Sequence, residues 1–111
     1  MEDQPQSRWT FLTNHTHVLV CIARDPDVRL RDVAQLVGIT ERAAQGIVGD
    51  LVDAGYVSRT RVGRRNRYAI NEALPLRHEL EQDQPVGKLL DVVSPVDRRD
   101  LRISAGSVGA T

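Results

Sequence analysis

Arginines crowd one short stretch of this chain, and their charge suits them to bind phosphate. Between Tyr56 and Ile70 there is no acidic residue, and the stretch contains Arg59, Arg61, Arg64, Arg65 and Arg67. The next stretch, 71–84, is acidic, with Glu72, Glu79, Glu81 and Asp83 against Arg77. Basic and acidic residues balance over the whole chain, at 15 each. We therefore expect phosphate binding at one place, with weak and strongly salt-dependent non-specific binding to nucleic acid.

A second group of residues has the chemistry of metal ligands. His17 and Cys21 are four residues apart and would share a helix face, with His15 nearby and His78 further along the chain. Further ligands are not evident, and Cys21, the single cysteine, lies in an apolar run where free cysteine commonly acts as a small buried hydrophobe. Burial would also raise the pKa of its thiol and suppress redox reactivity. We expect neither a metal nor a cofactor.

Catalysis has little support in the sequence. We find no nucleophile motif, phosphate-binding loop or paired catalytic acid. Asp50 and Asp53 fall on the solvent face of a predicted helix, where they more plausibly solubilise it or pair with arginines. The protein is therefore not expected to be an enzyme.

Length and composition are those of one ordinary small domain. The 111 residues, 41% of them hydrophobic, allow a modest core. No stretch reaches the ~18 apolar residues that a membrane span needs, and the start does not resemble a signal segment. We expect a cytoplasmic protein without a membrane partner, and a single cysteine agrees with a reducing compartment.

The arginine-rich stretch follows two short predicted helices that are joined by a tight turn. The first, from Arg31, has an apolar stripe formed by Val33, Ala34, Leu36 and Val37, and Gly38 ends it. Thr40 is a good N-cap for the second helix. The apolar face of that helix consists of Ala44, Ile47, Val48, Leu51 and Val52, and its outward face of Arg42, Gln45, Gly46, Gly49, Asp50 and Asp53. After Gly55 a hairpin, 57–70, turns at Gly63, with Tyr68 and Ile70 facing inward.

The run Gly-Ile-Thr-Glu-Arg-Ala-Ala-Gln-x-Ile-Val-x-Asp-Leu-x-x-Ala-Gly-Tyr-Val resembles the core of winged helix-turn-helix transcriptional regulators of the broad MarR/ArsR-like kind. The resemblance covers residues 13–70 approximately. It implies a mainly α fold with a small antiparallel β-hairpin, the wing. It also implies that the helix from Thr40 to Ala54 enters the major groove of double-stranded DNA. The wing from Val57 to Ile70 would lie on the backbone or minor groove, and a homodimer would read two half-sites.

That resemblance assigns roles to individual side chains. On the first turns of the second helix, Arg42 could bind guanine and Gln45 adenine, while Glu41 could accept from cytosine or orient Arg42. Thr40 belongs to the same surface. Arg64 and Arg65 would bind phosphate or the minor groove with Arg61 and Arg67 in support, and Arg31 could reach a phosphate. A merely solvated polar face is the alternative. Gly46 departs from the larger side chain expected there, so either the backbone approaches DNA closely or the contact surface is poorer.

We divide the whole chain into an N-terminal arm (1–12), the winged helix (13–70), a connector with a dimerisation helix (71–93), and a flexible tail (94–111). Residues 8–12 could form a short strand or extended arm, and Val28 to Leu30 a third strand beside the hairpin. Helix 14–24 is apolar on nearly every side and would be covered by the core or by a second subunit. Helix 86–93 is too short to be stable alone and must dock. The predicted dimer contacts are Trp9, Phe11, Val18, Ile22, Leu89, Leu90 and Val93, although Trp9 and Phe11 could instead pack on their own core.

The pattern as a whole predicts a homodimeric, sequence-specific DNA-binding transcriptional regulator. The alternative is a winged-helix adaptor that binds other proteins without specific DNA binding. An unknown small-molecule effector, if there is one, would bind between subunits near Trp9, Phe11 and the helix from Asn14.

Overall fold

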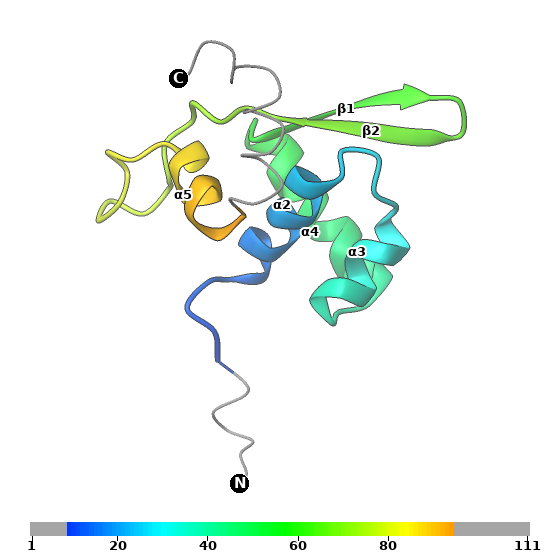
Figure 1. The fold of residues 1–111 in the computed structure, drawn as a ribbon, viewed down its shortest axis with the longest axis horizontal. Coiled ribbons are helices and arrows are strands. Elements are labelled where there is room, and N and C mark those ends of the chain that lie inside the picture. Colours follow the sequence, from blue (N-terminus) through cyan, green and yellow to red (C-terminus); the bar gives the residue numbers. More distant parts are fainter. Residues whose placement is uncertain (1–8, 95–111) are drawn as a thin grey trace, which may run out of the picture.

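Helices surround the base of one β-hairpin in the part of the chain that the structure describes (Figure 1). This computed structural model describes residues 9–94. The elements, in order, are α2 (Asn14–Arg24), α3 (Leu30–Val37), α4 (Glu41–Asp53), β1 (Val57–Val62), β2 (Arg65–Ile70) and α5 (Val86–Val93). This is a mainly α fold of the winged-helix type, as the sequence predicts. The frayed start predicted for 1–7 and the tail predicted beyond residue 94 lie outside the described residues. None of the helices in 9–94 is long and apolar enough to cross a membrane.

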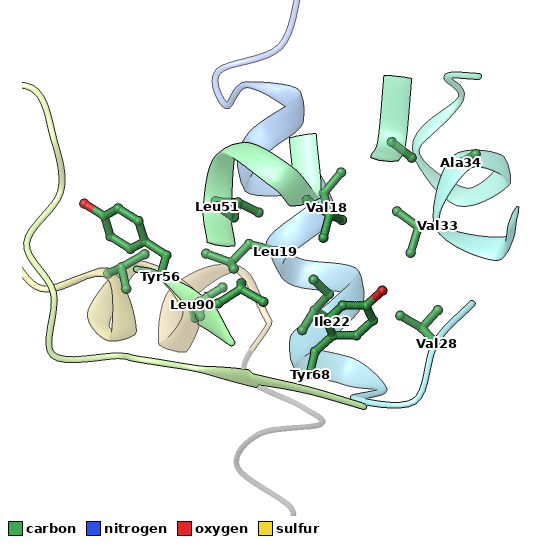
Figure 2. Close-up of a cluster of buried hydrophobic side chains, with 14 residues drawn as sticks. Val18, Leu19, Ile22, Val28, Val33, Ala34, Leu51, Tyr56, Tyr68 and Leu90 are labelled. Carbon is green, nitrogen blue, oxygen red and sulfur yellow. The ribbon is translucent and has the colours of Figure 1, made fainter. Parts of the chain in front are cut away.

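Helix α2 lies at the centre of the fold. Its side chains Val18, Leu19 and Ile22 are buried, and the helix contacts α3, α4, β2 and α5 (Figure 2). The helix ends at Asp25, where the following proline disfavours helical backbone. Of the two coverings expected for this apolar helix, the chain's own core is the one observed.

Three of the predicted dimer contacts are therefore wrong. Val18, Ile22 and Leu90 are each at most 1% exposed within the single chain. A side chain with no free surface cannot contact a second subunit in this fold. Leu89 and Val93 are half-buried.

Helices α3 and α4 form the predicted helix-turn-helix. Gly38 ends α3 in the left-handed region at φ +87°, which glycine enters without a steric penalty. The inward face of α3 is formed by Leu30, Val33, Ala34 and Val37, at helical spacing. The prediction that Leu36 belongs to this face is wrong, since the side chain falls outside that spacing and is 72% exposed.

The sheet described in residues 9–94 consists of the two hairpin strands alone, whereas three strands were expected. Register pairs Val57 with Ile70 and Val62 with Arg65, and the turn between the strands contains Gly63 at φ +64°. The third strand predicted at 28–30 is absent from the described residues, because Leu30 already begins α3. One backbone hydrogen bond replaces it, from the Tyr68 N–H to the Pro26 carbonyl at 2.9 Å.

Residues 9 and 10 belong to no helix or strand, and the chain bends at residues 11 and 12. The rings of Trp9 and Phe11 meet edge to face, with centroids 5.1 Å apart. Both are exposed, Phe11 to 92%, so the prediction that they pack on their own core is wrong. Contact with a second subunit stays a prediction.

Helix α5 has the predicted bounds and docks through its first turn. The Val86 N–H donates to the Leu74 carbonyl at 2.8 Å and the Gly87 N–H to the Glu72 carbonyl at 3.0 Å. Ser94 caps the far end and is 1% exposed, so the predicted flexible tail does not begin there. Its hydroxyl accepts a hydrogen bond from Arg24 Nε at 3.4 Å, which ties α5 to α2.

Gly87→Ala should destabilise the protein, because a Cβ at this position would lie 2.7 Å from Glu72 Cβ and 3.0 Å from the Glu72 carbonyl oxygen. We expect a loss of about 1–3 kcal/mol in the free energy of unfolding, measured by urea denaturation. Gly49→Ala is the control, since a Cβ there meets nothing within 4 Å and the substitution should gain about 0.5–1 kcal/mol of helix stability. Equal stability of the two variants would contradict the packing described for α5.

Candidate nucleic-acid interface

The first turn of α4 is fixed by its N-cap. Thr40 has extended backbone geometry, and its Oγ1 accepts a hydrogen bond from the Ala43 N–H at 3.0 Å. This bond satisfies one of the amide groups that a helix start leaves unpaired. Glu41 in the same turn suits the positive end of the helix dipole. The helix start is therefore well defined, and so are the directions of the side chains it carries.

Polar side chains project from this end of α4. Glu41, Arg42 and Gln45 are all exposed, while Ala44 and Val48 on the opposite side are buried. Arg42 and Gln45 are three residues apart, so they neighbour each other on one helix face. Neither makes a side-chain hydrogen bond or ion pair with any residue of 9–94. The structure thus brings together the four residues predicted at the start of α4, Thr40, Glu41, Arg42 and Gln45. Within the described residues, the side chains of the last three are free for a ligand, while the Thr40 Oγ1 already accepts from the Ala43 N–H.

Gly46 continues the same exposed face. A Cβ built on it meets nothing within 4 Å, so no contact within the described chain requires glycine at this position.

The arginines of the wing differ in whether their side chains are already hydrogen-bonded within the protein. Arg65 donates to the Asp27 carbonyl at 2.6 Å, and Arg67 donates to the two Asp27 carboxylate oxygens at 2.8 and 3.4 Å. The Arg61 Nε donates to the Gly63 carbonyl within the turn at 3.2 Å. Arg64, at the tip, has no side-chain partner among the described residues. All four are exposed, but Arg64 is the one whose whole hydrogen-bonding capacity is open.

Asp27 is a residue of this surface that the sequence analysis missed. Its carboxylate accepts from Arg67, and this hydrogen bond lowers the pKa of Asp27 and raises that of Arg67. Both side chains are about half exposed, so solvent screens the pair and its contribution to stability is small. The sequence analysis gave Asp27 no role, because no local pattern shows that it lies beside Arg67, forty positions further along the chain.

Both candidate surfaces lie on one side of the molecule. In Figure 1 the hairpin tip projects to the same side of α2 as α3 and the turn leading into α4, with the loop before α3 between them. Arg31, in the first turn of α3, is exposed and has no side-chain partner in the described part. The geometry suits a ligand with phosphates along its edges and hydrogen-bonding groups between them.

The metal-ligand pattern does not assemble into a site. His15 Nε2 lies 2.8 Å from Asp50 Oδ2, and His17 Nδ1 lies 3.2 Å from Asn14 Oδ1. Cys21 is half-buried, and burial raises the pKa of its thiol, against a smaller lowering by Arg24. Within residues 9–94 no group of three or more His, Cys, Asp or Glu side chains is placed to hold a metal ion.

Comparison with protein-family models and with curated proteins gives no match for this chain. The likeness to winged-helix proteins therefore rests on the fold, and the resemblance to regulators on the sequence pattern alone.

Thr40→Ala should lower the free energy of unfolding by about 1 kcal/mol, because it removes the acceptor for the Ala43 N–H. Thr13→Ala is the matched control, since Thr13 precedes α2 but makes no side-chain capping bond, and it should change stability by less than about 0.5 kcal/mol. Chemical denaturation followed by circular dichroism measures both. A control variant that loses as much as Thr40→Ala would refute the assigned cap.

Proposed function

We propose that this protein is a sequence-specific, double-stranded-DNA-binding transcriptional regulator that acts as a homodimer in the cytoplasm. The observation that carries the proposal is the combination of two surfaces on one side of the fold. One is the exposed polar start of α4, the second helix of a helix-turn-helix. The other is an arginine-bearing hairpin that follows it. In winged-helix proteins these parts enter the major groove and hold the adjoining backbone.

Each side chain has a role in this proposal. Arg42 can donate two hydrogen bonds to guanine and Gln45 can pair with adenine, while Glu41 accepts from cytosine or holds Arg42. Arg64 binds a phosphate or enters the minor groove. Arg31 lies at the start of α3, where backbone amides also favour an anion. Base contacts then supply specificity, and phosphate contacts fix the position on the duplex.

The dimer is proposed from exposed apolar side chains. The exposed rings of Trp9 and Phe11 meet edge to face, and on α5 the side chain of Val92 is 75% exposed. Large exposed apolar side chains are typical of association surfaces. Leu89 and Val93, half-buried on α5, would extend this surface.

A second candidate is a protein-binding adaptor that uses the same fold. The exposed Leu36 on α3 favours it, as does the engagement of Arg65 and Arg67 by Asp27, which reduces the charge offered to phosphate. Electrophoretic retardation of any duplex DNA at low salt separates the two candidates. Complete absence of retardation would favour the adaptor.

Arg42→Ala should lose discrimination between bound sequences, by about 1–3 kcal/mol at one base pair. Arg64→Ala combined with Arg65→Ala should weaken binding to every sequence and reduce the slope of log affinity against log salt by up to about 2. The measurement is a fluorescence anisotropy titration at several salt concentrations, after selection of bound sequences from a random pool. Recovery of an inverted repeat would support two-fold symmetry.

Lys88→Ala, which removes one positive charge away from the proposed interface, is the control for these variants. Lys88 is exposed on α5, which lies at the opposite end of the view in Figure 1 from the hairpin tip. We expect its salt slope to equal that of the wild type. A wing double variant that binds as tightly as wild type at every salt concentration would rule out the role assigned to the wing.

Asp27→Asn should strengthen DNA binding at low salt and steepen the salt slope by about 1, because Arg67 becomes available to a phosphate. Asp32→Asn removes the same charge from α3 without releasing an arginine, since Asp32 has no side-chain partner in the described part. It should therefore produce a smaller gain in the same titration. Weaker binding by Asp27→Asn than by wild type would contradict the competition between Asp27 and phosphate.

A further inference from the structure

A cavity of about 900 Å³ lies away from the wing, between the N-terminal segment, α2, the C-terminal end of α4, the 76–81 connection and α5. Its volume is in the range of sites that bind drug-sized molecules. The apolar residues of its lining are Phe11, Leu12, Leu19, Leu51, Ala54, Tyr56, Leu76, Val86 and Leu89. One chain forms the whole cavity, whereas the sequence analysis expected an effector site between subunits.

The two aromatic residues of the lining, Tyr56 and Phe11, differ in how far they are exposed. Tyr56 is mostly buried, and its hydroxyl donates to the Pro75 carbonyl, so the ring is held with its polar atom already satisfied. Phe11 lies at the mouth and is 92% exposed. An occupant with its own aromatic groups would cover that ring and remove apolar surface from water.

The charges in the lining are unbalanced. Asp50, Asp53 and Glu81 contribute carboxylates, against the single guanidinium of Arg77. Asp50 is engaged by His15 at 2.8 Å, but Asp53 and Glu81 have no side-chain partner among the described residues. Two carboxylates beside an apolar, aromatic-walled space attract a cation that is itself largely apolar, and they repel an anion of the same shape.

We propose that this cavity binds a lipophilic organic cation bearing aromatic groups. The ligand's aromatic groups lie against Phe11 and the apolar walls, and its positive charge lies near Asp53 and Glu81. This inference goes beyond the proposed DNA binding, and its test needs no DNA. Phe11 and Leu89 are also proposed dimer contacts, so a dimer that covered them would compete with the ligand.

Tetraphenylphosphonium and tetraphenylborate test the proposal, since they have the same shape and opposite charges. Trp9 is the single tryptophan and lies 5.1 Å from the Phe11 ring, so its fluorescence reports on the mouth of the cavity. Titration with the phosphonium should change this fluorescence with a Kd at least about tenfold lower than that of the borate, and should raise Tm. Equal Kd values for the two ions, or no response to the phosphonium, would overturn the proposal.

Substitutions then locate the site. Asp53→Asn combined with Glu81→Gln should weaken phosphonium binding at least about tenfold. Glu79→Gln removes one charge from the same connection but lies outside the lining, and should alter the Kd by less than about twofold. Phe11→Ala cannot unfold the core, because the ring is exposed, and should weaken binding measured by calorimetry. If the double variant and Phe11→Ala both bind like the wild type, the cation does not occupy this cavity.

Discussion

The fold depends on the burial of one face of α2. Val18, Leu19 and Ile22 form the surface on which α3, α4, β2 and α5 all pack. The other contacts between elements are those of α3 with α4, of α4 with β1, and between the two strands of the hairpin. Because hydrophobic burial is non-directional, it holds these elements together without fixing their angles. The angles come from local devices, such as Gly38 in the turn and the Thr40 cap. Central burial and local geometry together orient the exposed start of α4.

Helix α4 is the element that the two proposed sites share. Its N-terminal end carries Arg42 and Gln45, while its C-terminal end contributes Asp50 and Asp53 to the cavity. A helix of this length behaves as a rigid rod, since each turn is hydrogen-bonded to the next. Ala44 and Val48 of the same helix are buried, so the packing of α4 on the core keeps its two ends in a fixed relation. The His15–Asp50 contact joins side chains that are about half and two-thirds exposed, and it adds little to this packing.

Sequence predicted the parts of this fold that are fixed locally. The ends of α2, α5 and the hairpin, the cap at Thr40 and the turn at Gly63 all follow from residue type and spacing, and all are confirmed. Most of the errors concern what covers a surface. Leu36 in the core, and Val18, Ile22 and Leu90 at a dimer interface, were wrong because periodicity identifies an apolar side chain without saying what it packs against. The third strand at 28–30 was wrong because Leu30 already begins α3. The Asp27–Arg67 pair was missed because it joins residues forty positions apart, beyond the range of a local pattern.

The charge arrangement of the wing bears on specificity in the proposed regulator. Every arginine that binds phosphate strengthens binding to all sequences alike, because phosphates carry no sequence information. By engaging Arg65 and Arg67, Asp27 leaves Arg64 as the fully open cation of the tip and so limits this indiscriminate part of the affinity. In the proposed complex, the base contacts of Arg42 and Gln45 would then form a larger share of the total affinity. A neutral chain with a partly neutralised wing is in this way suited to discriminate between sites rather than to bind DNA tightly everywhere.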